Sequence, residues 1–387
     1  MSGSSGLFTV LDALDRWAVS RDFAGVDPYD GLAATRVPSR LKAATRTRQA
    51  LVQAAKRSPV DVRGLTGTRP RRIAKALGLY AGGYASLSQT TWDGQAKERG
   101  SSLLAWLAEH HGGAEETAAW GYEFDVQTRW AFYPAGSPNI IATTFVAAAF
   151  LDWYECSHEP SHLEEAKRAC RFLLAELLRD GSQGSYFAYV PGVSTLVHNA
   201  NLLGCALVAS CGSAAEQADW VTIARDAAET TLRATDERGL WSYGEGLGLE
   251  WIDGLHTAYT LGALHNVWCA AGDAEVLGAI RRGLDAYIRL LFTPQGVPRY
   301  SDRSLYPIDI HCASSAIDLF VRLRDVDERC WDLATGVARW TIAEMYDPSG
   351  FFYYQKTRWY TNKIPYIRWS QAHMFRALAR MAAAMPQ

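Results

Sequence analysis

The sequence lacks the features that would assign it to a disulfide-rich, zinc-binding or membrane class. Its seven cysteines form no C-x-x-C pair and mostly neighbour Ala, Leu or Val, so we expect buried free thiols. No apolar run reaches the ~18–20 residues that a membrane helix needs. The N-terminus MSGSSGLFTV has no basic region followed by a long apolar stretch, so no secretory signal is indicated. We therefore expect a cytoplasmic protein with no membrane span.

The chain also lacks a strong charge of either sign. Its formal net charge of −2 over 387 residues gives no overall attraction to nucleic acid or membranes, so we expect neither as a partner. Against this balance, residues 33–76 hold twelve Lys or Arg and a single acid, Asp61. This basic segment, residues 36–75 in particular, is either a solvated surface or a region that attracts an anionic polymer, and the sequence leaves its role open.

Aromatic residues, in contrast, are abundant, with 14 Trp, 18 Tyr and 13 Phe. Many of them lie in Gly-rich connections, where packing in a core explains them less well. The flat apolar faces of sugars stack on such rings, while polar neighbours bind the hydroxyls. This composition favours a saccharide, or another small polar and even anionic molecule, as the substrate.

Five polar residues recur along the chain at nearly one interval. Gaps of 59, 58, 55 and 57 residues separate Asn139, His198, His256, His311 and Arg368. Each stands at the start of an apolar, small-residue segment typical of a buried helix, and amphipathic charged segments alternate with these. Fixed-period self-similarity indicates a repeat architecture. We predict an all-α fold of six helical hairpins, an (α/α)6 toroid in which the apolar helices line a funnel.

The predicted boundaries follow from the same pattern. Residues 1–40 read as an N-terminal extension with a turn at DPYDGL, and residues 41–387 as a single toroid domain. The first outer helix is either residues 7–20 or residues 41–56. Short β-like arms are expected at the funnel mouth, because the loops before the inner helices contain Gly followed by aromatic residues. These loops carry a tyrosine at similar places, namely Tyr122, Tyr189, Tyr243, Tyr300 and Tyr354.

Residues able to transfer protons or to hold a sugar gather at these helix starts and loops. Histidine acts as acid or base near neutral pH, paired carboxylates suit glycoside hydrolysis, and a tyrosine beside Arg or Lys can have a lowered pKa. The catalytic candidates are His198, His256, His311, Tyr354, Tyr360, Glu123, Asp125, Glu245, Asp253 and Asp309. The substrate-binding candidates are Trp120, Tyr122, Asn139, Asn199, Asn201, Tyr243, Trp251, Tyr300, Arg303, Tyr306, Arg358, Tyr366, Arg368, Trp369 and Gln371.

Each candidate also has a structural interpretation. An Asp just before a helix is usually an N-cap, which suits Asp253 and Asp309 as well as a catalytic role does. A lone histidine at a helix start is more often a cap or a satisfied core residue. The recurrence of three histidines at similar positions is what favours function, and it predicts one composite site at the wide end of the toroid. Because these histidines lie 58 and 55 residues apart, without short metal-ligand spacing, we expect neither a metal nor a cofactor.

The chain resembles a bacterial family of six-hairpin toroid proteins associated with polysaccharide biosynthesis. The resembling stretches span nearly the whole chain and include DPYDGL (27–32), WGYEFDVQ (120–127), VHNANLLG (197–204), WIDGLHTAY (251–259), YPIDIHCASSAI (306–317) and IPYIRWSQAHMFRALA (364–379). More distantly, the chain is similar to toroids such as glucuronyl C5-epimerases, N-acylglucosamine 2-epimerases, unsaturated-uronide hydrolases and some polysaccharide lyases. The resemblance implies the toroid fold and a role in carbohydrate metabolism, and it carries over no catalytic residue.

Several functions fit these residues. The first is a sugar epimerase, acting on a uronic acid unit by acid/base proton transfer in the funnel. A glycoside hydrolase or a polysaccharide lyase of the six-hairpin type is the alternative, and a non-catalytic saccharide-binding toroid is another. A terpene-cyclase-like toroid is remote, because the D-x-D-D motif is absent and IDIH at residues 308–311 does not replace it. The sequence does not indicate the oligomeric state.

Overall fold

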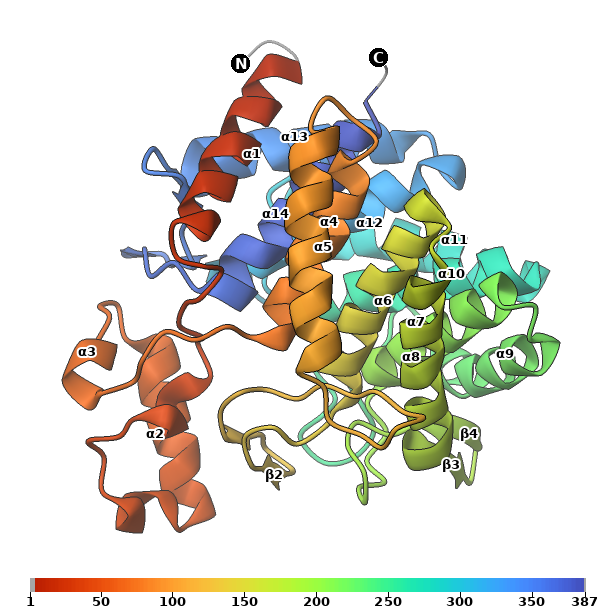
Figure 1. Ribbon diagram of the computed structural model, residues 1–387, viewed down its shortest axis with the longest axis horizontal. Helices are drawn as coiled ribbons and strands as arrows, with labels where there is room; N and C mark the ends of the chain where they lie inside the picture. Colours follow the sequence, from red (N-terminus) through yellow and green to blue (C-terminus); the bar gives the residue numbers. More distant parts are fainter. Residues whose placement is uncertain (1–3, 386–387) are drawn as a thin grey trace.

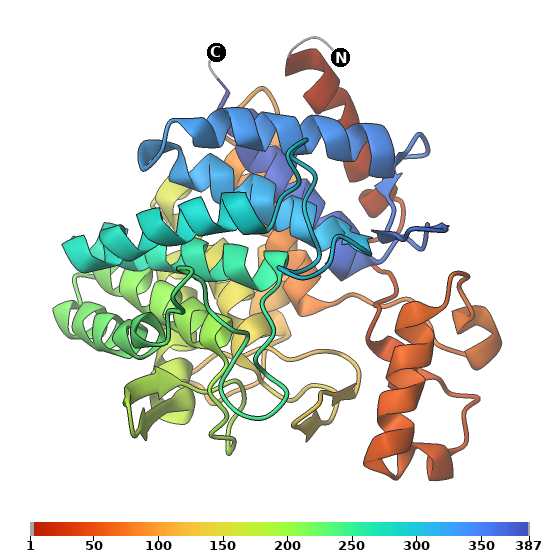
Figure 2. The ribbon, with the colours of Figure 1, turned by 180° about the vertical axis from the view of Figure 1, so that it is seen from behind.

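The computed structural model describes residues 4–385, and its main body is a ring of six helical hairpins (Figures 1 and 2). The inner helices are α4 (Ala74–Leu87), α6 (Ile140–Ser157), α8 (His198–Ala214), α10 (Gly254–Ala271), α12 (Ile310–Arg322) and the π-helical η5 (Ile367–Ala372) continued by α14 (His373–Ala383). Each inner helix contacts the next, and α14 contacts α4, so the ring is closed. The predicted (α/α)6 toroid is confirmed.

The outer helices cover the ring and explain the alternating sequence pattern. They are α5 (Asp93–Glu109), α7 (Pro160–Phe172), α9 (Ala218–Arg233), α11 (Ala274–Leu290), α13 (Arg329–Met345) and α1 (Ser4–Val19). Thirteen of the fourteen residues of α4 are buried, whereas only seven of the seventeen residues of α11 are. A helix covered on all sides must be apolar all round, and a helix covered on one side needs only an apolar stripe.

The first outer helix comes from the very start of the described chain. Of the two predicted segments, α1 takes this place by packing against α14, on the side of the ring where both termini lie (Figure 1). The boundary placed at residue 40 stays a prediction. Between α1 and α4 lie η1 (Asp30–Ala33), η2 (Ser39–Lys42), α2 (Thr45–Arg57) and α3 (Arg63–Thr66). In both views η2, α2 and α3 stand beside the ring, and we call residues 34–72 the basic lobe.

The short strands lie in the loops that lead from the outer helices to the inner helices. They pair as β1 (Val126–Gln127) with β2 (Phe132–Tyr133), β3 (Leu178–Gly181) with β4 (Gly184–Phe187), β6 (Tyr346–Asp347) with β7 (Phe351–Phe352), and β5 (Ile308–Asp309) with β8 (Gln355–Lys356), which also pairs with β9 (Thr361–Asn362). Two further short helical turns, η3 (Leu173–Leu177) and η4 (Leu323–Asp325), follow α7 and α12. The predicted β-like arms are therefore present.

A cyclic set of hydrogen bonds joins the start of each inner helix to the next unit. The first residue of an inner helix has an N–H without a partner inside its own helix. The carbonyl of the tyrosine in the following loop accepts it, at 3.0–3.1 Å, in the pairs Ile140–Tyr189, His198–Tyr243, Gly254–Tyr300 and Ile310–Tyr354. The recurring tyrosines seen in the sequence thus mark a backbone junction between neighbouring hairpins.

The same junction closes the ring in two modified forms. Ala74, the first residue of α4, donates to the carboxylate Oε1 of Glu123 at 2.7 Å, where other units use a carbonyl. Ile367, the first residue of η5, donates to the carbonyl of Val26 at 3.1 Å, which joins the last hairpin to the segment after α1. The residues from 25 to 30 therefore complete the ring at the seam between its first and last units.

We predict that Gly25→Ala weakens this seam. An added Cβ would stand 2.5 Å from Cβ of Ile367, so the backbone that carries Val26 must move. We expect a loss of about 1–3 kcal/mol in the free energy of unfolding, measured by urea denaturation followed by circular dichroism. Gly94→Ala in α5 is the matched control, because an added Cβ there meets nothing within 4 Å. Equal stability of the two variants would contradict this account of the seam.

Candidate functional site at the funnel mouth

The position of a residue within the first turn decides where its side chain points. Successive side chains of a helix are rotated by about 100°. Among the five recurring residues, Asn139 is the N-cap of α6, His198 is the first residue of α8, His311 is the second of α12, Arg368 is the second of η5 and His256 is the third of α10. They are therefore not equivalent, and the predicted arrangement of all five around one floor is wrong.

Residues in the second helical position meet at the centre of the ring. Lys75 of α4, His311 of α12 and Arg368 of η5 all occupy this position. Burial holds the pKa of His311 well below its usual value, and the charges of Lys75, Arg368 and His256 lower it further, so these four groups lie within electrostatic range of one another. The centre of the ring is consequently rich in cationic and potentially cationic groups.

A tyrosine and two histidines complete this central cluster. Tyr259 Oη makes a short hydrogen bond with His311 Nε2 and lies 3.3 Å from His373 Nε2. The rings of His311 and His373 are 3.9 Å apart, and Lys75 Nζ lies 4.0 Å from the centre of the Phe145 ring. Burial keeps the pKa of His373 and of Lys75 well below the usual range. Both imidazoles are therefore neutral near pH 7 and can relay a proton through Tyr259.

His256 is the recurring residue whose side chain remains partly accessible, at 25% exposure. Its Nδ1 lies 2.6 Å from Asp253 Oδ2, which also accepts a hydrogen bond from Trp251 Nε1 at 2.9 Å. Asp253 Oδ1 accepts from the backbone N of His256, so this carboxylate is at once the predicted N-cap and the partner of the imidazole. Burial works against the ionised form of Asp253, but His256 and the other donors outweigh it and lower its pKa.

This geometry prepares His256 for proton transfer. With Nδ1–H donated to the carboxylate, the lone pair of the neutral imidazole is on Nε2, and no described residue hydrogen-bonds that atom. A carboxylate that holds the tautomer and stabilises the imidazolium is the arrangement of a general base. The rings of Tyr243 and Trp251 stack with their centres 4.2 Å apart, and the centre of the Tyr243 ring is 4.7 Å from that of the His256 ring.

Aromatic and cationic side chains surround this histidine at the mouth. The Arg129 guanidinium lies 4.9 Å from the centre of the Trp251 ring, and that of Arg368 lies 4.9 Å from the Tyr122 ring. Lys56, which comes from the basic lobe, donates to Tyr29 Oη at 2.8 Å and lies 5.8 Å from the Trp369 ring. The rings of Trp251 and Tyr29 are partly exposed, whereas those of Tyr122 and Trp369 are buried. Partly exposed rings next to fixed charges are suited to a ligand that has flat apolar faces and anionic groups.

Arg368 is not free to bind a ligand carboxylate as its sequence position suggested. Asp27 accepts from two of its three guanidinium nitrogens, with Nε–Oδ2 at 2.6 Å and Nη2–Oδ1 at 2.7 Å, and both side chains are nearly inaccessible. Burial opposes the charge of Arg368, but Asp27 outweighs it and raises the pKa of the guanidinium. This bidentate pair fastens the seam segment to the mouth of the ring.

Glu123 is another predicted carboxylate that has a structural role. Its Oε1 accepts from Ala74 N, and its Oε2 has no hydrogen-bond partner among residues 4–385. Burial raises the pKa of Glu123 to about 7, so it is partly protonated at neutral pH.

This raised pKa predicts a pH-dependent stability difference for Glu123→Gln. Between pH 4.5, the ordinary pKa of a glutamate, and about pH 7, Glu123 holds a proton in the folded protein that it has lost in the unfolded chain. The contribution of this proton to the free energy of unfolding is therefore fully present below pH 4.5 and is lost as the pH rises towards 7. At about 1.4 kcal/mol per unit of pKa, the variant should gain up to about 3 kcal/mol relative to wild type over this range. Urea denaturation at a series of pH values measures it, and a constant difference would contradict the burial of a protonated Glu123.

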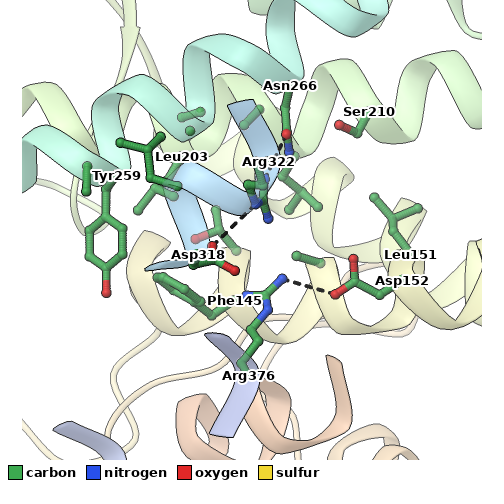
Figure 3. Close-up of a pocket in the computed structure, with 18 of the residues that line it drawn as sticks. Phe145, Leu151, Asp152, Leu203, Ser210, Tyr259, Asn266, Asp318, Arg322 and Arg376 are labelled. Carbon is green, nitrogen blue, oxygen red and sulfur yellow. Dashed lines mark hydrogen bonds and ion pairs between the residues drawn. The ribbon is translucent and has the colours of Figure 1, made fainter. Parts of the chain in front are cut away.

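A central cavity of about 110 Å³ lies on the far side of the central cluster, between the later turns of the inner helices (Figure 3). Its lining combines apolar residues such as Leu203 and Phe145 with charged pairs. Arg376 bonds Asp152 at 3.0 Å, while Arg322 lies 3.3 Å from Asp318 and bonds Asn266 at 2.9 Å. None of the residues predicted for the site lines this cavity. The paired charges join four inner helices and neutralise one another, which indicates a structural network.

Many predicted residues lie instead within the scaffold. Asn201 and Gln371 each bond the backbone of the strand before their helix, at Phe187 and Phe352, and His198 lies 3.2 Å from Thr231 of the outer helix α9. Burial lowers the pKa of His198 to about 4, so this histidine is neutral in the fold. Asn139 caps α6, Trp120 bonds the Leu107 carbonyl, Asp309 caps α12 and bonds Gln355 and Trp369, and Asn199 is buried.

Other predicted residues lie in the loops. Asp125 accepts from Ala135 N at 2.9 Å, and Tyr300, partly buried, contributes its carbonyl to the ring junction at Gly254 and lies within electrostatic range of Asp253. Glu245, Arg303, Tyr306, Arg358 and Tyr360 are exposed. The structure therefore brings together His256, Asp253, Tyr243 and Trp251, with Tyr122, Tyr300, Arg368 and Trp369 nearby, and leaves the remaining candidates in scaffold or surface positions.

The expected lowering of the tyrosine pKa is wrong for Tyr354 and Tyr366 of the C-terminal tail. Burial raises the pKa of Tyr354 well above its ordinary value, and it raises that of Tyr366 to about 12 although Arg63 lies beside it. Tyr354 Oη is buried without a partner among the described residues. Desolvation outweighs the nearby cations because the ionised phenolate would lose its water. Neither of these phenols is a base near neutral pH.

Sequence reasoning missed Lys75, Tyr259, His373, Asp27 and Lys56. Lys75 had a signal, because it holds the same helical position as His311 and Arg368 once the helices are aligned on their first residue. Tyr259 and His373 lie one turn further along their helices, and no repeat marks them. Across residues 4–385, no three His, Cys, Asp or Glu side chains come together as a metal site, and no helix is long and apolar enough to cross a membrane.

Known structures share this architecture at very low sequence identity. The cellobiose 2-epimerase from Bacillus thermoamylovorans is 9% identical, with a TM-score of 0.64 over 82% of this chain and 90% of that one. The GH76 α-mannanase BT2949 from Bacteroides thetaiotaomicron is 15% identical, with a TM-score of 0.58 over 79% and 85% of the chains. An unsaturated glucuronyl hydrolase specific for heparin is 11% identical, with a TM-score of 0.60 over 81% and 87%.

The sequence itself matches no family model and no curated protein. The similarity to solved structures therefore concerns the fold. The chain is a six-hairpin (α/α)6 toroid, as the resemblance of its sequence to such proteins implied.

Proposed function

We propose that this protein is a carbohydrate-active enzyme that epimerises a sugar, with a uronic acid unit as its substrate. The Asp253–His256 pair carries the proposal, because it provides a held imidazole whose Nε2 is open at the mouth of the funnel. Structures of the same fold include cellobiose 2-epimerases, a sugar epimerase and a D-mannose isomerase, which supports sugar chemistry by proton transfer.

In the proposed reaction His256 Nε2 takes the proton from C5 of the uronate. The electrons move into the carboxylate, which becomes enolate-like and needs a cation beside it. Arg129, at 4.9 Å from the Trp251 ring, is the accessible cation of this region, since Asp27 occupies Arg368. Burial keeps the pKa of Tyr243 and of Tyr300 raised, so these phenols hold a proton that one of them returns on the opposite face of C5.

Exchange of hydrogen with solvent tests this reaction class. The full-length protein is incubated in D2O with glucuronides, galacturonides and mannuronides as monosaccharides and oligosaccharides, and deuterium at C5 is measured by mass spectrometry and NMR. We expect incorporation into one of them, with inversion at C5. Incorporation followed by an unsaturated product would assign a lyase, which shares the first step. Absence of exchange in every uronide would refute the proposal.

A glycoside hydrolase is the second candidate, and it is favoured by Glu123, which holds the start of α4 through Oε1 and leaves Oε2 without a partner among residues 4–385. Its raised pKa of about 7 gives it a proton to donate at neutral pH, as the acid of a glycosidase must have. Asp253 would be the second carboxylate. This candidate predicts release of reducing ends, lost on Glu123→Gln and largely kept on His256→Asn. Saccharide binding without turnover would instead support a non-catalytic toroid.

A further inference from the structure

The near-zero net charge of this protein conceals a strong segregation of charge. Residues 33–76 carry twelve cations and one acid, a formal charge of +11. The whole chain carries −2, so the remaining residues together carry −13. Cations of the basic segment can pair with acidic residues of the remainder of the protein. Those that form no such ion pair remain available to attract an anionic partner.

Some cations of the basic lobe are used inside the protein. Arg63 pairs with buried Asp30 at 2.8 Å, Arg72 pairs with Asp22, and Lys56 bonds Tyr29. Arg48 bonds Gln127 at 2.7 Å, which connects α2 to the strand β1 of the mouth. These contacts fix the lobe beside the ring and account for the buried part of its charge.

Lys42 donates to the Ala34 carbonyl and Arg71 to the Glu123 carbonyl, and both are partly buried. The five other cations of the lobe are exposed and have no carboxylate partner, and they are Arg36, Arg40, Arg46, Arg57 and Arg69. None of them forms an ion pair with a described residue, and Arg36 reaches only backbone carbonyls. Asp61, the one acid of the segment, lies 3.4 Å from Arg63 and so compensates none of the five. The lobe thus offers five uncompensated guanidinium groups to the solvent.

An exposed hairpin next to the lobe extends this surface. Ser58, which follows α2, accepts through its carbonyl from Asn362 Nδ2 at 2.8 Å, so the β8–β9 hairpin lies against the lobe, as Figures 1 and 2 show. Trp359 at its tip is 84% exposed, with the Arg358 guanidinium 5.2 Å from its ring centre, and Lys363 is exposed at its base. A large indole left in solvent beside a guanidinium group is suited to stack on a sugar ring.

We propose that the basic lobe and the β8–β9 hairpin bind an acidic polysaccharide, whose anionic groups pair with the lobe arginines and whose sugar faces stack on Trp359. The chain of sugars then runs from this surface to His256 at the mouth. The inference rests on the proposed function for its choice of polymer, because the lobe is fixed to the same mouth through Lys56 and Arg48. Single-stranded nucleic acid and anionic membranes are the competing polyanions.

Charge reversal of the lobe tests this surface. The variant Arg40→Glu/Arg46→Glu/Arg57→Glu/Arg69→Glu is compared with Arg281→Glu/Arg282→Glu/Arg289→Glu/Arg339→Glu, which makes the same change of charge on exposed residues of α11 and α13. Binding of heparin and of polygalacturonate is measured at several salt concentrations. We expect the lobe variant to bind at least about tenfold more weakly, with a shallower salt dependence, and the control to bind within about twofold of wild type. Trp359→Ala should weaken binding without changing the salt dependence.

The outcomes separate this inference from the proposed function. Turnover of a short uronide should be unchanged in the lobe variant, whereas turnover of the polymer should fall with its binding. If the wild type binds neither polymer, if both quadruple variants lose binding equally, or if single-stranded DNA or phosphatidylserine vesicles bind more tightly than the polysaccharides, the inference is wrong. If the polymers bind through the lobe but no uronide exchanges hydrogen, the proposed reaction fails while the binding surface stands.

Discussion

His256→Asn is expected to lower the rate of C5 hydrogen exchange by about a thousandfold while leaving the fold intact. General acid–base catalysis contributes about 10²–10⁴-fold to a rate, and an amide cannot take the proton. The substitution keeps a side chain of similar size beside Tyr243 and a donor for Asp253, so the thermal unfolding temperature should change little. Asp253→Asn should have a smaller effect on the same rate and should shift its pH profile, because the imidazole loses the carboxylate that stabilises its charged form.

His198→Asn is the matched control for this experiment. His198 recurs in the sequence one interval before His256, but it lies against Thr231 and is buried. Its replacement should alter stability and leave the exchange rate within about threefold of wild type, since its side chain meets Thr231 and it reaches the mouth residue Tyr243 only through its backbone N, which the variant keeps. Equal losses of exchange in the two variants would show that the observed effect reflects folding, and an unaffected His256→Asn would remove His256 from the reaction.

Asp27→Asn is expected to lower the free energy of unfolding by about 3–5 kcal/mol. Removing one partner of a buried ion pair leaves the other charge desolvated and uncompensated. Here the Arg368 side chain is 5% exposed and that of Asp27 is 0% exposed. The pair also fastens the seam segment beside the Val26–Ile367 hydrogen bond, so limited proteolysis should cut the variant first near residue 30. Urea denaturation measures the loss.

Two further variants show whether this cost comes from the unpaired charge. Asp226→Asn breaks the exposed pair with Arg225 and should leave the free energy of unfolding nearly unchanged, because surface ion pairs contribute little to stability. Asp27→Leu combined with Arg368→Met removes both charges and should be less destabilising than Asp27→Asn alone. A loss below about 1 kcal/mol for Asp27→Asn, or a double variant less stable than the single one, would contradict the account.

The fold was predictable from the sequence because its signal is repeated six times. An error of one residue in any single helix start does not change the 55–59-residue interval that identifies the hairpins. The site was less predictable, because a shift of one residue relative to the helix start changes the direction in which a side chain points. His198 and His311 differ by one position relative to the start of their helices, and one faces an outer helix while the other lies at the centre.

The basic lobe shows another limit of the sequence pattern. Residues 41–56 read as a possible outer helix because α2 is amphipathic, yet only Val52 of this helix is buried. Periodicity reports that one stripe is apolar, and it does not report how much surface a neighbour covers. Lys75 illustrates the opposite case, since a lysine in the sequence suggests a surface position and this one is 2% exposed.

The hydrogen bonds that connect each inner helix to the following loop also set the order in which the protein can be completed during synthesis. Every inner helix leaves its first N–H unpaired until the next hairpin has been made. The last inner helix differs, because the N–H of its first residue, Ile367, pairs with the carbonyl of Val26, a residue translated more than 300 positions earlier. The N-terminal segment therefore gains its contacts with the last hairpin only after the C-terminal helix has been made, and contacts of such long sequence separation are slow to form.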